Sequence, residues 1–249
     1  MANKIAVLIP AAGASTRFKG KRKKQFCDID GRAVFLRTVE RFADREDVGQ
    51  VVLAIPADEE ELFQIKWGAS VGFHGVKVIL GDDERYKTVR KLLAEVKEGM
   101  NLIALHDAVR PCVTAEQIDA VFAAAAQSGA AILAHRLVGT IKRVGDQNII
   151  AKTLDRTEMW EAQTPQVFKP EIIRRAYENI ESVKEKITDD AQLVEALGIP
   201  VQVVEGTTSN IKITSEEDIA IAGAILKARD KAKKPKGSAG PFADEREMW

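Results

Sequence analysis

The sequence predicts an α/β fold: a Rossmann-like three-layer α/β/α sandwich with a mostly parallel sheet and a protruding β-hairpin arm. Short apolar runs alternate with segments of helical apolar spacing through the first half of the 249 residues, which is typical of a parallel sheet covered on both faces. Between residues 138 and 165 this alternation stops. Two β-rich runs there flank turn-forming residues 145–148, which indicates a hairpin that leaves the body of the domain.

The expected strands and helices of the first half follow one another in regular order. They are strands at 5–9, 51–55, 76–80, 102–105 and 130–134, and helices at 33–42, 58–70, 86–97 and 115–127. In such sheets ligands bind beyond the carboxyl ends of the strands. Because residues 10–15, 81–83 and 106–107 each follow an expected strand, we expect three loops to meet in one crevice.

The second half is expected to complete one domain over residues 1–228, with the arm inserted at about 137–160. Its expected elements are hairpin strands at 140–144 and 149–154, helices at 170–180 and 189–197, a strand at 201–204 and a last helix at 215–227. Residues 229–249 are charged, contain Pro and Gly and lack apolar periodicity. We therefore expect a disordered tail there.

Composition narrows the kind of partner. Lys+Arg and Asp+Glu are equal at 37 each, so no global charge favours nucleic acid or a membrane surface, and small partners are expected. Cys27 and Cys112 form neither a disulfide framework nor a C-x-x-C metal pair. Because neither a signal peptide nor a run of roughly 20 apolar residues is recognised, we expect a cytoplasmic protein.

The first expected strand ends in a turn of small residues, PAAGAS at 10–15, followed by a basic stretch. The basic residues are Arg17, Lys19, Lys21, Arg22, Lys23 and Lys24. Small residues let backbone N–H groups approach an anion, and cations neutralise phosphate oxygens, which predicts a polyphosphate site. A P-loop does not fit, because six residues separate Gly13 from Gly20. This stretch alone leaves a solvated surface loop and a nucleic-acid patch open as alternatives.

The same stretch resembles the signature of nucleotidyltransferases that join a sugar or polyol phosphate to a nucleoside monophosphate. AAGASTRF at 11–18 and Lys24-Gln25 carry the resemblance, with Ser15 in place of a glycine and Phe18 in place of a methionine. Later motifs resemble, in order, those of the 2-C-methyl-D-erythritol 4-phosphate cytidylyltransferase family. They are HDAVRP at 106–111, DRTEMW at 155–160, QTPQ at 163–166, TDDA at 188–191 and NIKIT at 210–214.

The resemblance implies transfer of CMP from CTP to the phosphate of 2-C-methyl-D-erythritol 4-phosphate, with release of pyrophosphate, in non-mevalonate isoprenoid precursor biosynthesis. It implies that Arg17 and Lys24 stabilise the transition state, and that Arg156 and Lys212 position the polyol phosphate. The implied nucleotide-binding residues are Pro10, Ala11, Ala12, Gly13, Ala14, Ser15, Gly81, Asp82, Asp83 and Thr88. The implied substrate-binding residues are Arg110, Thr140, Thr164 and Thr188.

Three further positions depart from the family pattern: Asp82 replaces a glycine, Thr88 a serine, and Gly139 stands where aspartate is common. Cytosine preference is therefore inferred mainly from the family. Gly139 in place of aspartate affects the expected local geometry of the hairpin.

Asp107 is the candidate ligand for Mg²⁺, or for another divalent cation, because this ion binds few carboxylates together with substrate phosphates. The alternative for Asp107 is an N-cap or turn aspartate. His106 is expected to be structural, since an attacking phosphate monoester is already mostly ionised near neutral pH. Because Thr140 and Arg156 lie on the expected arm, the resemblance implies a homodimer in which each active site borrows them from the second subunit.

Two other functions are considered. A ribitol-5-phosphate cytidylyltransferase would share the loop, the His-Asp motif, QTPQ and Asn-Ile-Lys, but the segment at 155–160 favours methylerythritol phosphate. An RNA-binding protein could use the basic loop at 17–24, but this loop lacks interleaved aromatic residues for base stacking, and no wider basic face is expected.

Overall fold

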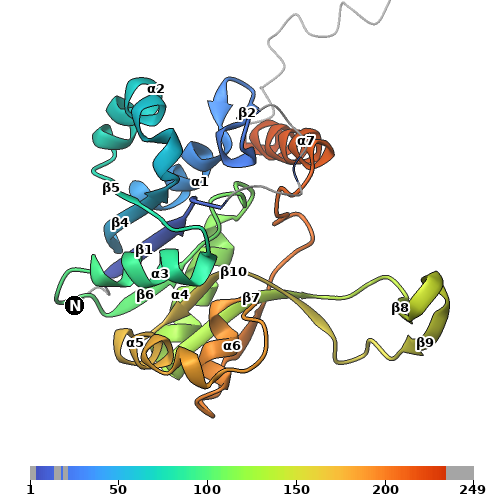
Figure 1. Ribbon diagram of the computed structural model, residues 1–249. Coiled ribbons are helices and arrows are strands. Elements are labelled where there is room, and N and C mark those ends of the chain that lie inside the picture. Colours follow the sequence, from blue (N-terminus) through green and yellow to red (C-terminus); the bar gives the residue numbers. More distant parts are fainter. Residues whose placement is uncertain (1–3, 14–17, 19–21, 234–249) are drawn as a thin grey trace, which may run out of the picture.

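The structure is a computed structural model that describes residues 4–13, 18 and 22–233. Its centre is a seven-stranded sheet in the order β11-β7-β10-β6-β1-β4-β5 (Figure 1). The strands are β1 (Ile5–Pro10), β4 (Val48–Ile55), β5 (Lys77–Leu80), β6 (Leu102–Leu105), β7 (Ala130–Arg136), β10 (Trp160–Phe168) and β11 (Gln202–Glu205). Neighbouring strands are parallel except where β10 pairs antiparallel with β6 and β7. The predicted mostly parallel sheet is confirmed.

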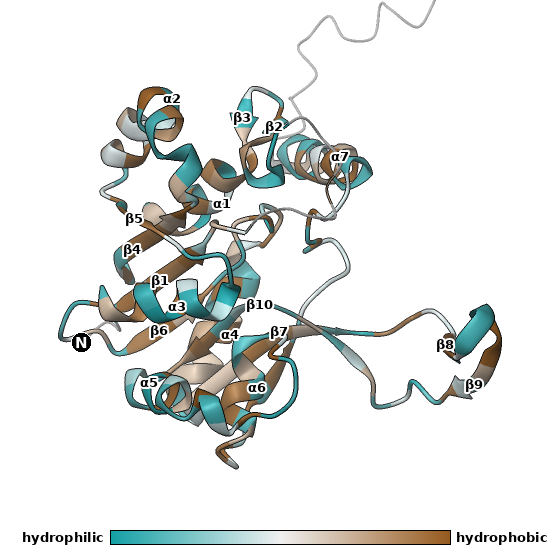
Figure 2. Cartoon of the chain, in the orientation of Figure 1, coloured by the Kyte–Doolittle hydropathy of each residue, from teal (hydrophilic) through white to brown (hydrophobic). Residues whose placement is uncertain are grey.

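Helices cover both faces of the sheet. Because side chains alternate along a strand, Ile5, Val7 and Ile9 of β1 pack into one apolar core while Ala6 and Leu8 pack into the other. The first core is covered by α1 (Val34–Ala43), α2 (Glu60–Phe73) and α4 (Ala115–Ser128), and the second by α3 (Arg85–Ala94), α5 (Pro170–Glu178) and α6 (Asp190–Glu195). Figure 2 shows apolar strands between helices with hydrophilic outer faces, which confirms the predicted three layers.

The last helix, α7 (Glu216–Lys233), packs beside a two-stranded ribbon of β2 (Asp28–Ile29) and β3 (Arg32–Ala33). The sequence predicted an end near 227 and a tail from 229, but residues 229–233 continue the helix, so that boundary was wrong. Residues 234–249, where the disordered tail was expected, lie outside the described residues. Short 3-10 segments complete the described chain: η1 (Lys24–Phe26), η2 (Ala57–Glu59), η3 (Asp146–Asn148) and η4 (Ile180–Ser182).

The predicted arm is confirmed as a hairpin. β8 (Ile141–Val144) and β9 (Ile150–Leu154) pair antiparallel with each other and extend away from the body of the domain (Figure 1). Val138, Val144, Ile149 and Ile150 are at least half exposed there. The arm therefore presents apolar surface that the described part of this chain does not cover.

Strand β10 was not predicted. It contains Pro165, and proline within a run argues against an interior strand. The structure accommodates it because pairing with β7 is interrupted between Ala162 and Gln166. Gln163 and Thr164 thus leave the regular ladder beside the end of β6 and line a cavity there.

Strand order locates the ligand-binding edge. From β1 the chain moves outward to β4 and β5, then crosses back to β6 on the other side of β1. This reversal separates the loops that follow β1 and β6, and crevices at such points bind ligands. Among the described residues, no helix is long and apolar enough to span a membrane.

Candidate active site

The loop after β1 is held by hydrogen bonds to its backbone. The Ala11 N–H donates to the Ala54 carbonyl (2.8 Å), and the Gln25 side-chain amide donates to the carbonyls of Ala11 (2.7 Å) and Gly13 (3.2 Å). Lys24, next to Gln25, lines the same cavity as residues 10–13. The other residues predicted for this loop, Ala14, Ser15 and Arg17, lie outside the described residues.

An aromatic cluster anchors the segment that carries Lys24. Phe26 is buried, stacks on Trp67 with ring centroids 5.2 Å apart and meets Phe35 edge-on at 5.7 Å. Burial of these rings fixes η1 against the first core. Lys24 is thereby placed between a core anchor at Phe26 and the loop after β1.

Gly81 lies so close to Ala12, in the loop after β1, that no side chain fits at position 81. A Cβ atom on Gly81 would lie 2.2 Å from the Cβ of Ala12. Thr88 stabilises the turn, because its Oγ1 accepts from the Asp82 N–H (2.8 Å) and donates to the Asp82 carbonyl (3.1 Å). The Asp82 carboxylate forms an ion pair with Lys91 Nζ at 2.9 Å. Asp83 is exposed on the same turn.

Asp107 follows β6 and is surrounded by cations. Its Oδ2 lies 2.8 Å from Lys212 Nζ and 3.4 Å from Arg110 Nε, and its Oδ1 lies 3.7 Å from Arg85 Nε. Burial by itself raises the pKa of Asp107, but the charges of Lys212, Arg85 and Arg110 outweigh it and hold this pKa well below its ordinary value. The carboxylate is ionised within a positively charged site that suits phosphate groups.

His106 supports this loop from beneath. It is fully buried, and burial lowers its pKa to about 4, so the ring is neutral near neutral pH. One consistent tautomer has Nε2 donating to the Arg110 carbonyl and Nδ1 accepting from the Thr164 hydroxyl, both at 3.1 Å. The Thr164 Oγ1 in turn accepts from the Asp107 N–H at 3.1 Å. These contacts support the structural role expected for His106.

Arg85 is a central residue to which the sequence reasoning gave no role. Its NH1 and NH2 donate to the two carboxylate oxygens of Asp190 at 3.0 and 2.6 Å. Burial acts to lower the pKa of Arg85, but Asp190 and Asp107 outweigh it and raise this pKa, so the guanidinium stays charged. The only local signal was its place after residues 81–84, since Asp190 lies 105 positions away.

Asp190 is itself locked in place. It is fully buried and accepts from the Tyr177 hydroxyl at 2.6 Å. Gln166 Oε1 accepts from the N–H groups of Asp190 and Ala191, both at 3.0 Å. Because β10, α5 and α6 all contribute, the position of Arg85 depends on packing of the second core.

Two cavities meet at the charged centre and share Arg85, Asp107 and Lys212. The first, of about 180 Å³, is further lined by residues 10–13, Lys24, Gln25, Asp82, Thr88, Ala108 and Val109. The second, of about 200 Å³, is further lined by Arg110, Ala162, Gln163, Thr164, Gln166, Thr188 and Asp189. Two ligands, one in each cavity, would therefore face each other across Asp107 and Lys212.

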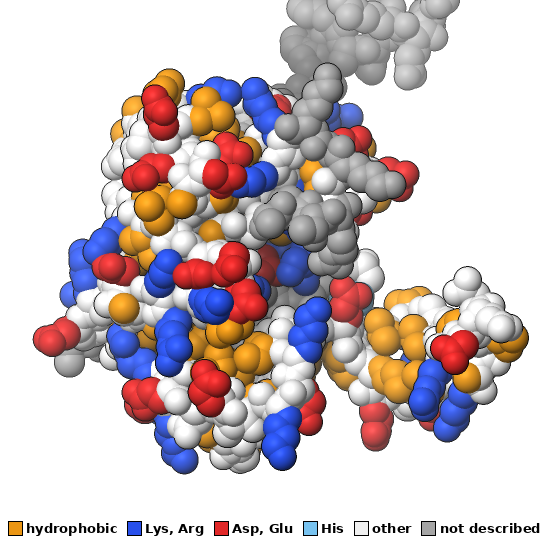
Figure 3. Space-filling view, viewed as in Figure 1, with side chains coloured by type: hydrophobic (Ala, Val, Ile, Leu, Met, Phe, Trp, Pro, Cys, Tyr) orange, Lys and Arg blue, Asp and Glu red, His pale blue; other side chains and the backbone are white. Residues whose placement is uncertain are grey.

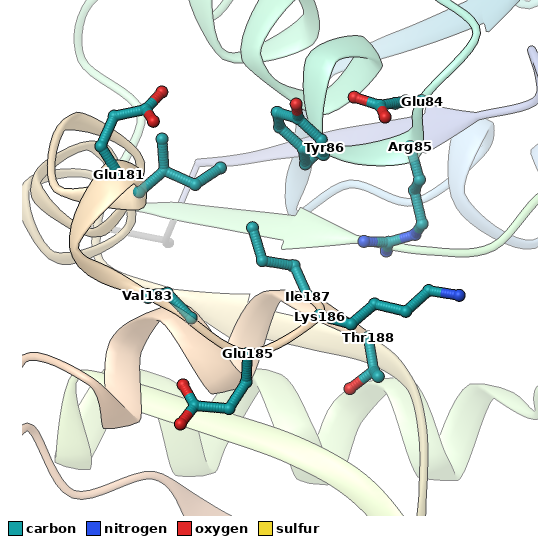
Figure 4. A pocket seen from close by; sticks show the side chains of 10 residues that line it. Glu84, Arg85, Tyr86, Glu181, Val183, Glu185, Lys186, Ile187 and Thr188 are labelled. Carbon is teal, nitrogen blue, oxygen red and sulfur yellow. The ribbon is translucent and has the colours of Figure 1, made fainter.

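A third cavity, of about 500 Å³, adjoins the second (Figure 4). It lies between the start of α3 and the segment 180–188, and Figure 4 shows Arg85 and Thr188 coming from these opposite walls. The Thr188 N–H donates to Gln192 Oε1 at 2.8 Å, and its hydroxyl lies 3.1 Å from the same atom. Thr188 is thus held against the first turn of α6, and it lines the second and the third cavity.

The arm residues are not brought to this centre. Thr140 and Arg156 are exposed and line none of the three cavities described above. Arg110, by contrast, is buried in the wall of the second cavity, where its NH1 donates to the Asn210 carbonyl at 2.7 Å. Within one chain, the described site therefore contains Lys24, Lys212 and Arg110 of the predicted cations, together with Arg85.

Fold and site together define the class of protein. A loop of small residues and a carboxylate surrounded by cations lie where the strand order of the mostly parallel sheet reverses, and two cavities meet there. This is the arrangement of a nucleotidyltransferase. The model of the 2-C-methyl-D-erythritol 4-phosphate cytidylyltransferase family, IspD, matches residues 5–228, and the chain belongs to this family.

Relatives and solved structures agree with this assignment. The 2-C-methyl-D-erythritol 4-phosphate cytidylyltransferase of Endomicrobium trichonymphae is 38% identical over 225 residues, which cover 90% of this chain and 100% of the relative. The crystal structure of the Francisella tularensis enzyme of that name has a TM-score of 0.75 at 31% identity, covering 90% and 100% of the two chains. The 4-diphosphocytidyl-2C-methyl-D-erythritol synthase of Anaerococcus prevotii has a TM-score of 0.77 at 28% identity, covering 91% and 97%.

Proposed function

We propose that the protein transfers CMP from CTP to 2-C-methyl-D-erythritol 4-phosphate, giving 4-diphosphocytidyl-2-C-methyl-D-erythritol and pyrophosphate. The observation that carries this proposal is the pair of cavities that share Arg85, Asp107 and Lys212. The cavity beside the small-residue loop suits a nucleoside triphosphate, because backbone N–H groups and Lys24 can face its phosphates. The other, lined by hydroxyl and amide side chains, suits a polyol phosphate.

The reaction needs positioned charge and little proton transfer. A phosphate oxygen of the polyol phosphate attacks the α-phosphorus of CTP, forming a new P–O bond, while the bond to the bridging oxygen of the β-phosphate breaks and pyrophosphate leaves. Lys212 and Arg85, which border both cavities, would stabilise the charge that develops on the phosphates, and Lys24, in the wall of the first cavity, would face the leaving pyrophosphate. His106 is neutral, buried and engaged at both nitrogens, which fits a reaction that requires no general base.

Mg²⁺ is the metal ion that we propose for this site. No cluster of three acidic, His or Cys ligands occurs among the described residues, but Asp107 offers a hard carboxylate that suits an ion bound mainly through substrate phosphates. When bound, the ion would neutralise phosphate charge. Substrate phosphates that engage Lys212 and Arg85 would free the Asp107 oxygens for it.

We also propose a homodimer in which the arm of a second copy brings Thr140 and Arg156 to the second cavity. The arm exposes apolar side chains, gathered on its surface in Figure 3. Thr140 directly precedes β8 and Arg156 follows β9, and neither lines the two cavities of its own chain. Free Cys27 and Cys112 and the balanced charge suit a cytoplasmic enzyme with small substrates. RNA binding through the basic loop has less support, because Lys23 is bound to Asp58 at 2.6 Å.

Pyrophosphate release from CTP and Mg²⁺ tests the proposal. We expect turnover with 2-C-methyl-D-erythritol 4-phosphate, none with ribitol 5-phosphate, and loss of turnover on chelation by EDTA with recovery on added Mg²⁺. Turnover with ribitol 5-phosphate alone would assign the protein to the alternative substrate. Absence of turnover with either would refute the proposed reaction.

A further inference from the structure

The loops that carry Asp107 and Lys212 have no regular secondary structure to hold them. Residues 106–114 and 206–215 form neither helix nor strand. The loops are joined to each other, because the Ile213 N–H donates to the Val109 carbonyl (2.9 Å) and Arg110 NH1 donates to the Asn210 carbonyl (2.7 Å). Their common position must then be set by what packs on them from outside.

Helix α7 supplies part of that packing, beside α1 and β10, which also bond the two loops. Ala222 and Leu226 are buried in one apolar cluster with Val109, Cys112 and Ile213, which belong to the two loops. The next residue on this face of the helix, by the spacing of i, i+4 and i+7, is Arg229. On this face of α7, the apolar residues are therefore followed by a cation at the last position that contacts the loops.

Arg229 binds one atom of each loop. Its NH1 donates to the Cys112 carbonyl at 2.5 Å, and its NH2 donates to Ser209 Oγ at 2.7 Å. Cys112 lies two residues after Arg110, and Ser209 lies three residues before Lys212. A guanidinium holds several donors in one rigid plane, so it can fix the separation of two acceptors where a lysine could not.

The contact continues into the loop that carries Lys212. Ser209 Oγ lies 2.8 Å from Thr207 Oγ1, which accepts from Gln117 Nε2 at 3.1 Å. The Asn210 N–H donates to the Thr207 carbonyl at 3.1 Å. Arg229 therefore completes a set of hydrogen bonds that begins on α7 and ends at the residues preceding Lys212.

We propose that Arg229 is a positioning residue of the enzyme: it clamps the two loops so that Lys212 and Asp107 keep their separation in the reacting centre. A role of Arg229 in catalysis rests on the proposed function, whereas its contacts with the two loops do not. Arg229 lies one position beyond the residues matched by the family model, in a segment to which the sequence assigned no chemistry.

The first experiment compares Arg229→Ala with Arg229→Lys and with Lys227→Ala. Lys227 is an exposed cation of the same helix, paired with Asp30 at 2.8 Å on the side away from the loops. We expect Arg229→Ala to lower kcat/KM for both substrates about tenfold, the scale of two lost hydrogen bonds, because Asp107 and Lys212 border both cavities. Arg229→Lys should recover only part of this loss, and Lys227→Ala should behave as the wild type.

A double-mutant cycle separates positioning from general stability. If Arg229 acts through Lys212, Arg229→Ala should cost little further activity once Lys212→Ala is present. Fold losses that multiply would show independent action and overturn the proposal, as would an Arg229→Ala variant with wild-type constants.

Hydrogen exchange provides a readout that does not need turnover. In Arg229→Ala we expect faster amide exchange at 207–213 and at Cys112 and Val113, with unchanged exchange in β1 and β4. Uniformly faster exchange would mean that Arg229 only stabilises the fold, and unchanged exchange would mean that no clamp exists. A wild-type enzyme without turnover would refute the proposed function, while this measurement would still decide the clamp.

Discussion

Lys212 Nζ lies 2.8 Å from Asp107 Oδ2, at the boundary of the two cavities. The two residues are far apart in the sequence and belong to loops of different connections, yet they form the tightest ion pair of Asp107 among the described residues. The pair keeps a cation and a potential metal-binding carboxylate together at the point where two substrates would meet.

Replacing Lys212 should abolish most of the activity without unfolding the protein. We expect Lys212→Ala to reduce kcat/KM by about 10²-fold or more, the usual cost of removing a group that stabilises developing charge. Arg85 and Arg110 remain beside the buried Asp107 in this variant, so the protein should stay folded, with a melting temperature lowered by the loss of one partner of Asp107. Pyrophosphate release and thermal unfolding measure the two effects, with the exposed Lys231→Ala on α7 as the matched control. Full activity in Lys212→Ala would remove Lys212 from the reaction.

Gly81 should be intolerant of any side chain. The Cβ of Gly81→Ala would lie 2.2 Å from the Ala12 Cβ, so the loops after β1 and β5 would have to separate. We expect a higher KM for CTP and a lower melting temperature. Gly72→Ala is the control, because its Cβ would meet nothing within 4 Å and alanine favours a helix by up to about 1 kcal/mol. Equal behaviour of the two variants would contradict the close approach seen here.

The buried His106 should make the protein less stable in acid. Its pKa is about 4 in the folded state against about 6.5 for an exposed histidine, so the unfolded state binds more protons between these values. Stability from this residue is complete above about pH 6.5 and is lost as pH falls towards 4, by at most about 3 kcal/mol.

Urea unfolding of wild type and His106→Asn at pH 7 and pH 4.5 measures this contribution. The variant is expected to be less stable at pH 7 but to lose less of its remaining stability in acid. An identical acid sensitivity of both proteins would show that His106 is not its source.

The proposed exchange of arms predicts complementation between inactive variants. Arg156→Ala and Lys212→Ala should each be nearly inactive alone. If each site combines Lys212 of one subunit with Arg156 of the other, mixing equal amounts with subunit exchange should restore about one quarter of the sites. Pyrophosphate release before and after mixing measures this. No recovery, despite exchanged subunits seen by mass spectrometry, would mean that each site uses its own arm or none.

The sequence alone determined the alternation of strands and helices, the arm and the family motifs, because these depend on local periodicity and on short residue patterns. It determined in this way that the loops at 10–13, 81–83 and 106–107 share one edge of the sheet. Residues such as Gly81 could be singled out by motif, although the reason, contact with Ala12, could not.

Tertiary structure alone decided the rest. Strand β10 forms despite Pro165 because β6 and β7 pair with it from both sides, which no local preference indicates. Arg85 meets Asp190, and Arg229 meets Ser209 and Cys112, only after distant elements pack together. A charged side chain takes its role from the partners that folding places within a few ångströms, and sequence spacing carries no record of that distance.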